Sequence, residues 1–158
     1  MKRNHKRERR DQRVIRTWTY AQAMAALPYV ASVMRSVRER RLEAVRLQLQ
    51  GRRLARAPGR ADRSKIIAQE EAAHAVRLAE DRFQEAIEEL EPLDIYCLHP
   101  IHGEALVPFV HDEQLAWFVF DLFEPDHLRF WRYHSDALET RRPIAEALAG
   151  PGQEKLIV

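Results

Sequence analysis

The chain has little cysteine and little glycine, and it has no long apolar run. Its single cysteine, Cys97, excludes an intramolecular disulfide framework and a cysteine-rich zinc site. Its five glycines include no G-x-x-x-x-G-K arrangement, which excludes the common phosphate-cradling loop. No stretch approaches the ~20 apolar residues needed to cross a bilayer. No apolar segment of the signal-peptide type precedes Trp18, so we expect a cytoplasmic protein without membrane contact.

The chain also lacks a recognisable nucleophile. Cys97 lies in an apolar stretch with no basic neighbour in sequence, which predicts a raised pKa and an inert thiol. No serine sits in the Gly-rich elbow of a hydrolase. The sequence therefore predicts no catalytic residue and no cofactor.

Charge of either sign is plentiful, but it is unevenly placed. The net charge of +2 divides into +6 for residues 1–16, zero for 17–34, +8 for 35–65 and −12 for 66–158. A basic first part and an acidic second part require an explanation, either inside the fold or in a partner.

The first half of the chain predicts a helical hairpin over residues 19–91. Thr19 and Gln22 have the spacing of a capping box, which places a helix start there. Pro28 should either kink this helix or begin a new one. Pro58-Gly59 marks a turn, and a second helix should run from about 62 to 91. Its apolar seam is predicted at Ile66, Gln69, Ala73, Val76, Glu80, Phe83, Ile87 and Leu90.

The hairpin offers one explanation for the charge pattern. Arginines of the first helix can face glutamates of the second, which accounts for much of the polarity without any ligand. The tip has more positive charge than Asp62, the only acid nearby, can neutralise. It is therefore either a solvated loop or a site for RNA or for an acidic protein surface. The candidate residues are Arg52, Arg53, Arg56, Arg60, Arg63 and Lys65.

The second half changes to an alternating pattern, which predicts strands at 93–98, 104–110, 115–123 and 128–133. Short links favour an antiparallel meander. The predicted fold class is α+β: a long antiparallel helical hairpin packed on a small antiparallel β-meander of three or four strands. Pro108 indicates an edge strand or a bulge.

The strand at 115–123 is apolar on both faces, so both should be covered. The hairpin can cover one face. The C-terminal segment or a second copy of the chain must cover the other, and we expect a homo-oligomer, in the first place a homodimer. The predicted organisation is a disordered basic arm at 1–16, one domain at 17–145 with the sheet at 93–133 and an exit segment at 134–145, and a loose tail at 146–158. The arm is either a solubilising tail or a further contact for nucleic acid.

Two sets of polar residues could bind ligands. His99, His102 and His127 fall at turns that share one end of a meander, which allows a metal site, although structural or solvent-facing histidines explain the pattern better. Arg129, Arg141 and Arg142, together with Arg132, could clamp a carboxylate or phosphate, or they could pair with nearby acids. Glu71-x-x-His74 has di-metal spacing, but it lies off the predicted seam and indicates a solvent-facing pair.

Several short motifs give the chain a family resemblance. They are Trp18-Thr19, Ala26-Leu27-Pro28, Phe123-Glu124-Pro125, Arg129-Phe130-Trp131 and Arg141-Arg142-Pro143-Ile144. With the hairpin between them, the chain over 17–145 resembles a prokaryotic family of unknown function, domain of unknown function 2203. The family tends to have Trp-His at Trp131-Arg132 and Gly-Phe at Ala137-Leu138. The resemblance implies a fold and a cytoplasmic setting, and no activity.

Three functions follow as expectations. The first is a self-associating interaction or scaffold module without catalytic activity. The second is binding to RNA or the ribosome through the basic arm and the hairpin tip. The third is a small metal-dependent enzyme that uses the three histidines.

Overall fold

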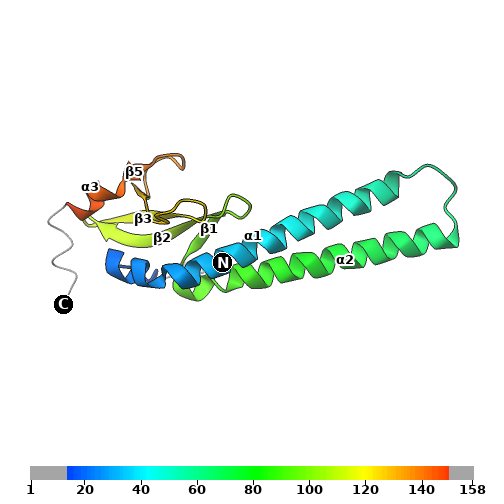
Figure 1. Ribbon diagram of the computed structural model, residues 1–158, viewed down its shortest axis with the longest axis horizontal. Coiled ribbons are helices and arrows are strands. Elements are labelled where there is room, and N and C mark those ends of the chain that lie inside the picture. The colour runs from blue at the N-terminus through cyan, green and yellow to red at the C-terminus, as the bar shows by residue number, and fades with distance from the viewer. Residues whose placement is uncertain (1–13, 150–158) are drawn as a thin grey trace, which may run out of the picture.

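Two long helices form a hairpin that extends well beyond a small sheet (Figure 1). The computed structural model describes residues 14–149. Helix α1 spans Tyr20–Arg56 and α2 spans Arg63–Glu88. At ~1.5 Å per residue they are about 55 and 39 Å long. Among the described residues, no helix is both long and apolar enough to cross a membrane.

The first turn of α1 is held as its sequence predicts. Thr19 Oγ1 accepts from Gln22 N at 3.1 Å, and Gln22 Oε1 accepts from Thr19 N at 3.1 Å, which completes the capping box. Pro28 lies inside α1, and the helix continues through it without a second start. Pro28 is exposed, so the carbonyl that it leaves unbonded can be hydrated.

The contact between the two helices is made mainly by small residues. Ala44 of α1 and Ala79 and Ala86 of α2 are buried, whereas Ile66 is 46% exposed. The predicted seam is therefore wrong at Ile66, Ala73 and Glu80, all exposed. The buried stripe of α2 lies about one residue away, because alanines let the two helix backbones approach closely.

The sheet has five antiparallel strands in the order β1-β2-β3-β4-β5, so the chain is a meander. The strands are β1 Tyr96–His99, β2 Glu104–His111, β3 Gln114–Asp121, β4 Phe130–Tyr133 and β5 Arg142–Pro143. A short 3-10 turn, η1 Glu91–Leu93, joins α2 to β1, and helix α3 Ile144–Leu148 follows β5. The α+β class is confirmed. The fifth strand was missed because a two-residue strand leaves no alternating pattern.

The inner face of the sheet packs on the hairpin. Phe118 and Phe120 of β3 are fully buried with Val30 and Met34 of α1 and Leu90 after α2. Phe109 of β2 stacks on Phe118 with ring centroids 3.8 Å apart. The alternation read from the sequence of β3 is confirmed, because its even-numbered side chains enter this core while Leu115, Trp117 and Val119 join a separate cluster.

The outer face of the sheet is covered within one chain. Leu106, Trp117 and Val119 form a buried cluster there. Trp117 Nε1 donates to His134 Nδ1 at 3.1 Å, which ties the segment after β4 to this face. An uncovered face of β3 therefore gives no argument for a homodimer, and the homodimer stays a prediction.

The expected boundaries shift at both ends. Arg16 N donates to Asp94 Oδ2 at 2.7 Å, and Trp18 Nε1 donates to Leu93 O at 2.9 Å, so the contacts of the folded domain begin inside the expected arm. The rest of that arm, residues 1–13, lies outside the described residues. At the other end, Ala147 of α3 is buried where a loose tail was expected. The remainder of the tail, from 150 onward, also lies outside them.

Pro108 lies in the part of β2 that is no longer paired with β1. β1 pairs with β2 only from Glu104 to Leu106. Beyond that point Pro108 O accepts from Trp18 N at 2.8 Å. Proline has no N–H to donate, so an edge position of this kind is the one it tolerates in a sheet.

Candidate nucleic-acid interface

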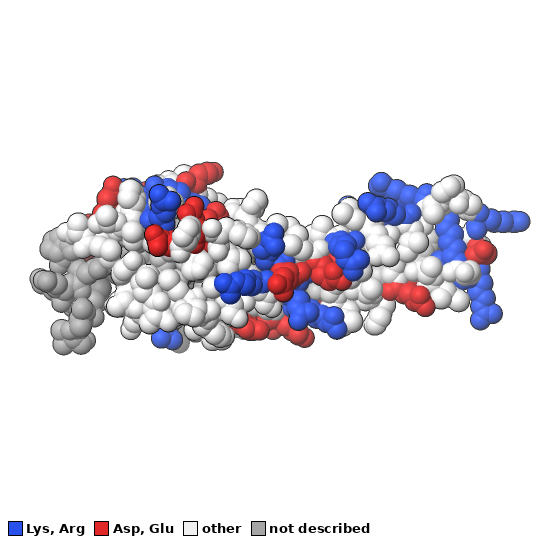
Figure 2. All heavy atoms as spheres, viewed as in Figure 1, with Lys and Arg blue, Asp and Glu red and all other residues white. Residues whose placement is uncertain are grey.

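The hairpin tip is the most basic surface of the described chain. It comprises the end of α1, the connecting loop and the first turn of α2, and it lies at the end of the hairpin remote from the sheet (Figure 1). Figure 2 shows blue side chains gathered around this end. Asp62 is the only acidic residue between Glu43 and Glu70.

Local hydrogen bonds hold the tip in shape. Asp62 Oδ1 accepts from Lys65 N at 2.8 Å and so caps the start of α2. Lys65 Nζ donates to Ala57 O at 2.8 Å and to Gly59 O at 3.4 Å, which satisfies carbonyls where α1 ends. Gly59 has a φ of +123°, a backbone conformation that favours glycine. Lys65 and Asp62 therefore serve the loop itself.

The five tip arginines have no such internal role. Arg52, Arg53, Arg56, Arg60 and Arg63 are all exposed, and none forms an ion pair or a side-chain hydrogen bond within residues 14–149. The structure thus places the predicted tip residues together. Lys65 differs from the five arginines because its side chain is bonded to the connecting loop.

The middle of the hairpin differs from the tip. Arg46 pairs with Glu43 of its own helix at 2.7 Å, and Gln48 Nε2 donates to Glu80 Oε1 at 2.7 Å across the hairpin. Arg41 lies over the Phe83 ring at 5.4 Å. No ion pair joins α1 to α2 in the described chain, so the expected facing of arginines and glutamates gives no direct contact between opposite charges.

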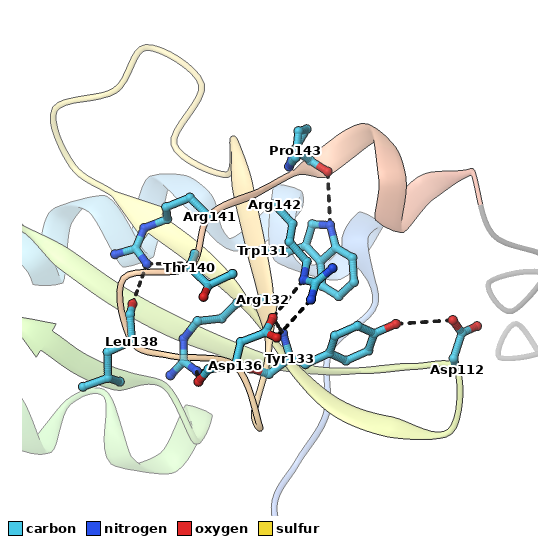
Figure 3. Close-up of polar contacts among 10 residues, drawn as sticks. All are labelled: Asp112, Trp131, Arg132, Tyr133, Asp136, Leu138, Thr140, Arg141, Arg142 and Pro143. Atoms are coloured by element: carbon cyan, nitrogen blue, oxygen red, sulfur yellow. Dashed lines mark hydrogen bonds and ion pairs between the residues drawn. The ribbon is translucent and has the colours of Figure 1, made fainter.

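The predicted anion clamp is taken up by internal pairing. Arg142 Nε and an Nη of the same guanidinium donate to the Asp136 carboxylate at 2.8 and 2.9 Å (Figure 3). Arg141 pairs with Glu104 at 3.4 Å, and Arg129 pairs with Glu124 at 3.4 Å. Because each of the three arginines has a different carboxylate, the structure does not bring them together as one clamp.

Arg141 and Arg142 instead hold the segment 134–141 over the sheet. The bidentate bond from Arg142, helped by the Tyr133 N–H at 2.9 Å, lowers the pKa of Asp136 to about 2. Arg141 also donates to the carbonyls of Leu138 and Thr140 at 2.7 and 2.9 Å (Figure 3). The guanidinium groups of Arg141 and Arg142 are therefore engaged in holding this segment in place.

Arg132 is one of the arginines that the sequence grouped as a possible anion clamp, but its burial was not predicted. It is 3% exposed, and one of its terminal nitrogens donates to the carbonyls of Tyr133 and Asp136 at 3.1 and 3.2 Å. Burial, together with the charge of Arg141, lowers the pKa of Arg132. The alternation of β4 could have indicated an arginine on the outer face of the sheet, because Arg132 pairs in register with Trp117 of the outer cluster.

The predicted metal ligands do not form a site. The rings of His99 and His102 lie 5.8 Å apart, edge to face. His127 is placed elsewhere, with Nδ1 2.9 Å from Asp121 O and its ring against Phe120. Over residues 14–149, no three His, Cys, Asp or Glu side chains are placed to hold one ion. Meander turns at one end of a sheet need not converge when the strands differ in length.

Comparison with known proteins gives no relative: no family model matches the chain, and no curated protein or solved structure is significantly similar to it. The resemblance to domain of unknown function 2203 therefore stays a prediction. Any function must be argued from the residues themselves.

Proposed function

We propose that the protein binds RNA through the phosphate backbone, using the five arginines of the hairpin tip. The observation that supports this is their lack of any internal partner, whereas Arg129, Arg141 and Arg142 near the sheet each pair with a carboxylate. Unpaired positive charge gathered at one end repels itself and is unfavourable for folding alone. Binding of a polyanion offsets this repulsion, because each phosphate contact releases condensed counterions.

The shape of the tip supports phosphate contacts and not base reading. Two packed helices are about 20 Å wide, too broad for the deep and narrow major groove of an RNA duplex. Arginine offers a bidentate fork to phosphate. The tip carries no exposed aromatic side chain on which bases could stack. The binding should therefore be independent of sequence and sensitive to salt.

The test is the affinity for mixed-sequence RNA, measured by fluorescence anisotropy against salt. Five contacts should weaken binding about 100- to 500-fold between ~50 and ~200 mM salt, for single strands and duplexes respectively. Replacing Arg53 and Arg56 by glutamine leaves three contacts and should reduce this ratio to about 20- to 40-fold.

A matched control has the same charge change elsewhere on the hairpin. Arg35 and Arg77 are exposed and lie outside the tip, so their double replacement by glutamine should leave the salt ratio as in the unaltered protein. Equal losses in the two double variants would show diffuse attraction and reject the tip. Absence of binding at low salt would reject the function altogether. Comparing the RNA affinity of a chain that lacks residues 1–13 with that of the full chain measures how much the arm contributes to binding.

A further inference from the structure

A groove of about 540 Å³ lies where the sheet end of α2 meets β1 and the first described residues of the chain. Tyr96 on its wall is 61% exposed, so the groove is open to solvent in the described part of the chain. Arg41 of α1 lies over the Phe83 ring at 5.4 Å and borders the groove at the end nearer the tip. The remaining walls are mostly apolar and include Ile87, Leu90, Ile95, Cys97 and Trp117.

Acidic residues border the sheet end of this groove. Glu91 and Asp94 lie on its wall, and Glu88 follows the wall residue Gln84 by one turn of α2. Asp94 Oδ2 accepts from Arg16 N at 2.7 Å. Glu88 and Glu91 are exposed, and neither forms an ion pair with a basic side chain of residues 14–149. The sequence around them offers no positive charge, because residues 83–128 contain eleven Asp and Glu and no Lys or Arg.

We propose that the occupant of this groove is the chain's own N-terminal segment, residues 1–13, which precedes the described part. Its position selects it: Ile15 lies on the groove wall, so the segment is tethered at the groove and has a high effective concentration there. Its charge selects it as well, since residues 1–13 contain seven Lys and Arg against Glu8 and Asp11, a balance of +5. A basic segment joined to an acidic groove is complementary to it.

The residue types of the segment suit both the walls and the border. Lys and Arg side chains pack their methylene stems on apolar surface while the charged group stays in water. In the docked segment the stems lie on Ile87 and Leu90, and the charged groups reach Glu88 and Glu91. Each exposed ion pair contributes little, so docking depends on several pairs together and weakens as salt is added.

This contact accounts for part of the charge polarity of the chain within one molecule. The basic first residues meet the acidic end of α2, where the hairpin itself forms no ion pair between its helices. The contact is separate from RNA binding, because the groove and the tip lie at opposite ends of α2.

The test is cross-linking of the full chain by a zero-length carbodiimide without RNA, followed by mass spectrometry. The reagent joins an amine to a carboxylate in contact with it, and the segment contains two lysines, Lys2 and Lys6. We expect links from them to Glu88, Glu91 and Asp94 at ~50 mM salt, about fivefold fewer at ~500 mM.

Glu70 and Glu71 are the matched control carboxylates. Both are exposed, and Glu71 lies about 30 Å from Glu91 along α2, within the roughly 43 Å that thirteen extended residues can span. They should form few links to the segment, since they lie outside the groove. Links that fall on them as often as on Glu88 and Glu91 would overturn the inference.

Trypsin cleavage within residues 1–13 gives a second measurement, because docking protects the segment. Glu88→Gln with Glu91→Gln should raise the cleavage rate about fivefold, whereas Glu70→Gln with Glu71→Gln, the same charge change, should leave it as in the unaltered protein. Equal rates in the two double variants would contradict docking. Cross-links between light and heavy chains in an isotope mixture would place the segment on another copy and overturn the intramolecular contact.

Discussion

Cys97 gives a direct test of how β1 packs against the end of α2. It is the only thiol of the chain, so any thiol signal belongs to it. Its side chain lies on the wall of a cavity of about 540 Å³, together with Phe83 and Ile87 of α2. Burial raises the pKa of Cys97 to about 11, because the thiolate loses hydration there and gains no positive partner. We predict a thiol that reacts slowly at neutral pH.

The expected slowing follows from the thiolate fraction. At pH ~8 an unperturbed cysteine with a pKa of about 8.5 is about one-quarter thiolate. A pKa of about 11 leaves about one part in a thousand, roughly 240-fold less. A more basic thiolate is a better nucleophile, which restores roughly 13-fold for a Brønsted slope of ~0.45. The net expectation is a rate about 20-fold lower than in the unfolded chain.

The assay is the rate of reaction with an aromatic disulfide reagent, followed by absorbance in the native state and in guanidinium chloride. The native rate should continue to rise nearly tenfold per pH unit beyond pH ~9, where the unfolded chain has begun to level off. It should also be proportional to reagent concentration, which excludes reaction limited by local opening. A native rate that levels off near pH ~8.5, or that equals the unfolded rate, would refute the packing argument.

Two further predictions concern stability. Gly51 lies inside α1, and a Cβ there would meet nothing within 4 Å, so Gly51→Ala should raise the free energy of unfolding by about 0.5–1 kcal/mol. Gly103→Ala should lower it, since φ is +70° and the new Cβ would stand 2.6 Å from Leu122 Cβ. Thermal unfolding of both variants checks the contrast. Asp136→Asn should lower the melting temperature at neutral pH by breaking the bond to Arg142. Because the folded pKa of Asp136, about 2, lies below its ordinary 3.8, that stabilisation is present above pH ~4 and is lost towards pH ~2. The melting temperatures of variant and unaltered protein should therefore converge at low pH, and a constant gap would contradict the assignment.

Local patterns in the sequence were enough for the helices and the main strands. The capping box at Thr19 depends on residues three apart, and the alternation along β3 is set by the pleat of one strand. Both are therefore visible without knowledge of the rest of the fold. The seam of α2 was not, because its buried positions are alanines while Ile66 faces solvent. Size alone misleads where two helix backbones come close together.

The residues of the candidate site likewise include some that the sequence could predict and some that it could not. The tip arginines are near one another in sequence, so their clustering was predictable. The fate of Arg141 was not, because its partner Glu104 lies 37 residues away and meets it only through the path of the segment 134–141. The buried position of Arg132 likewise depends on the register between β3 and β4. Side chains whose partners are fixed by tertiary register need the structure.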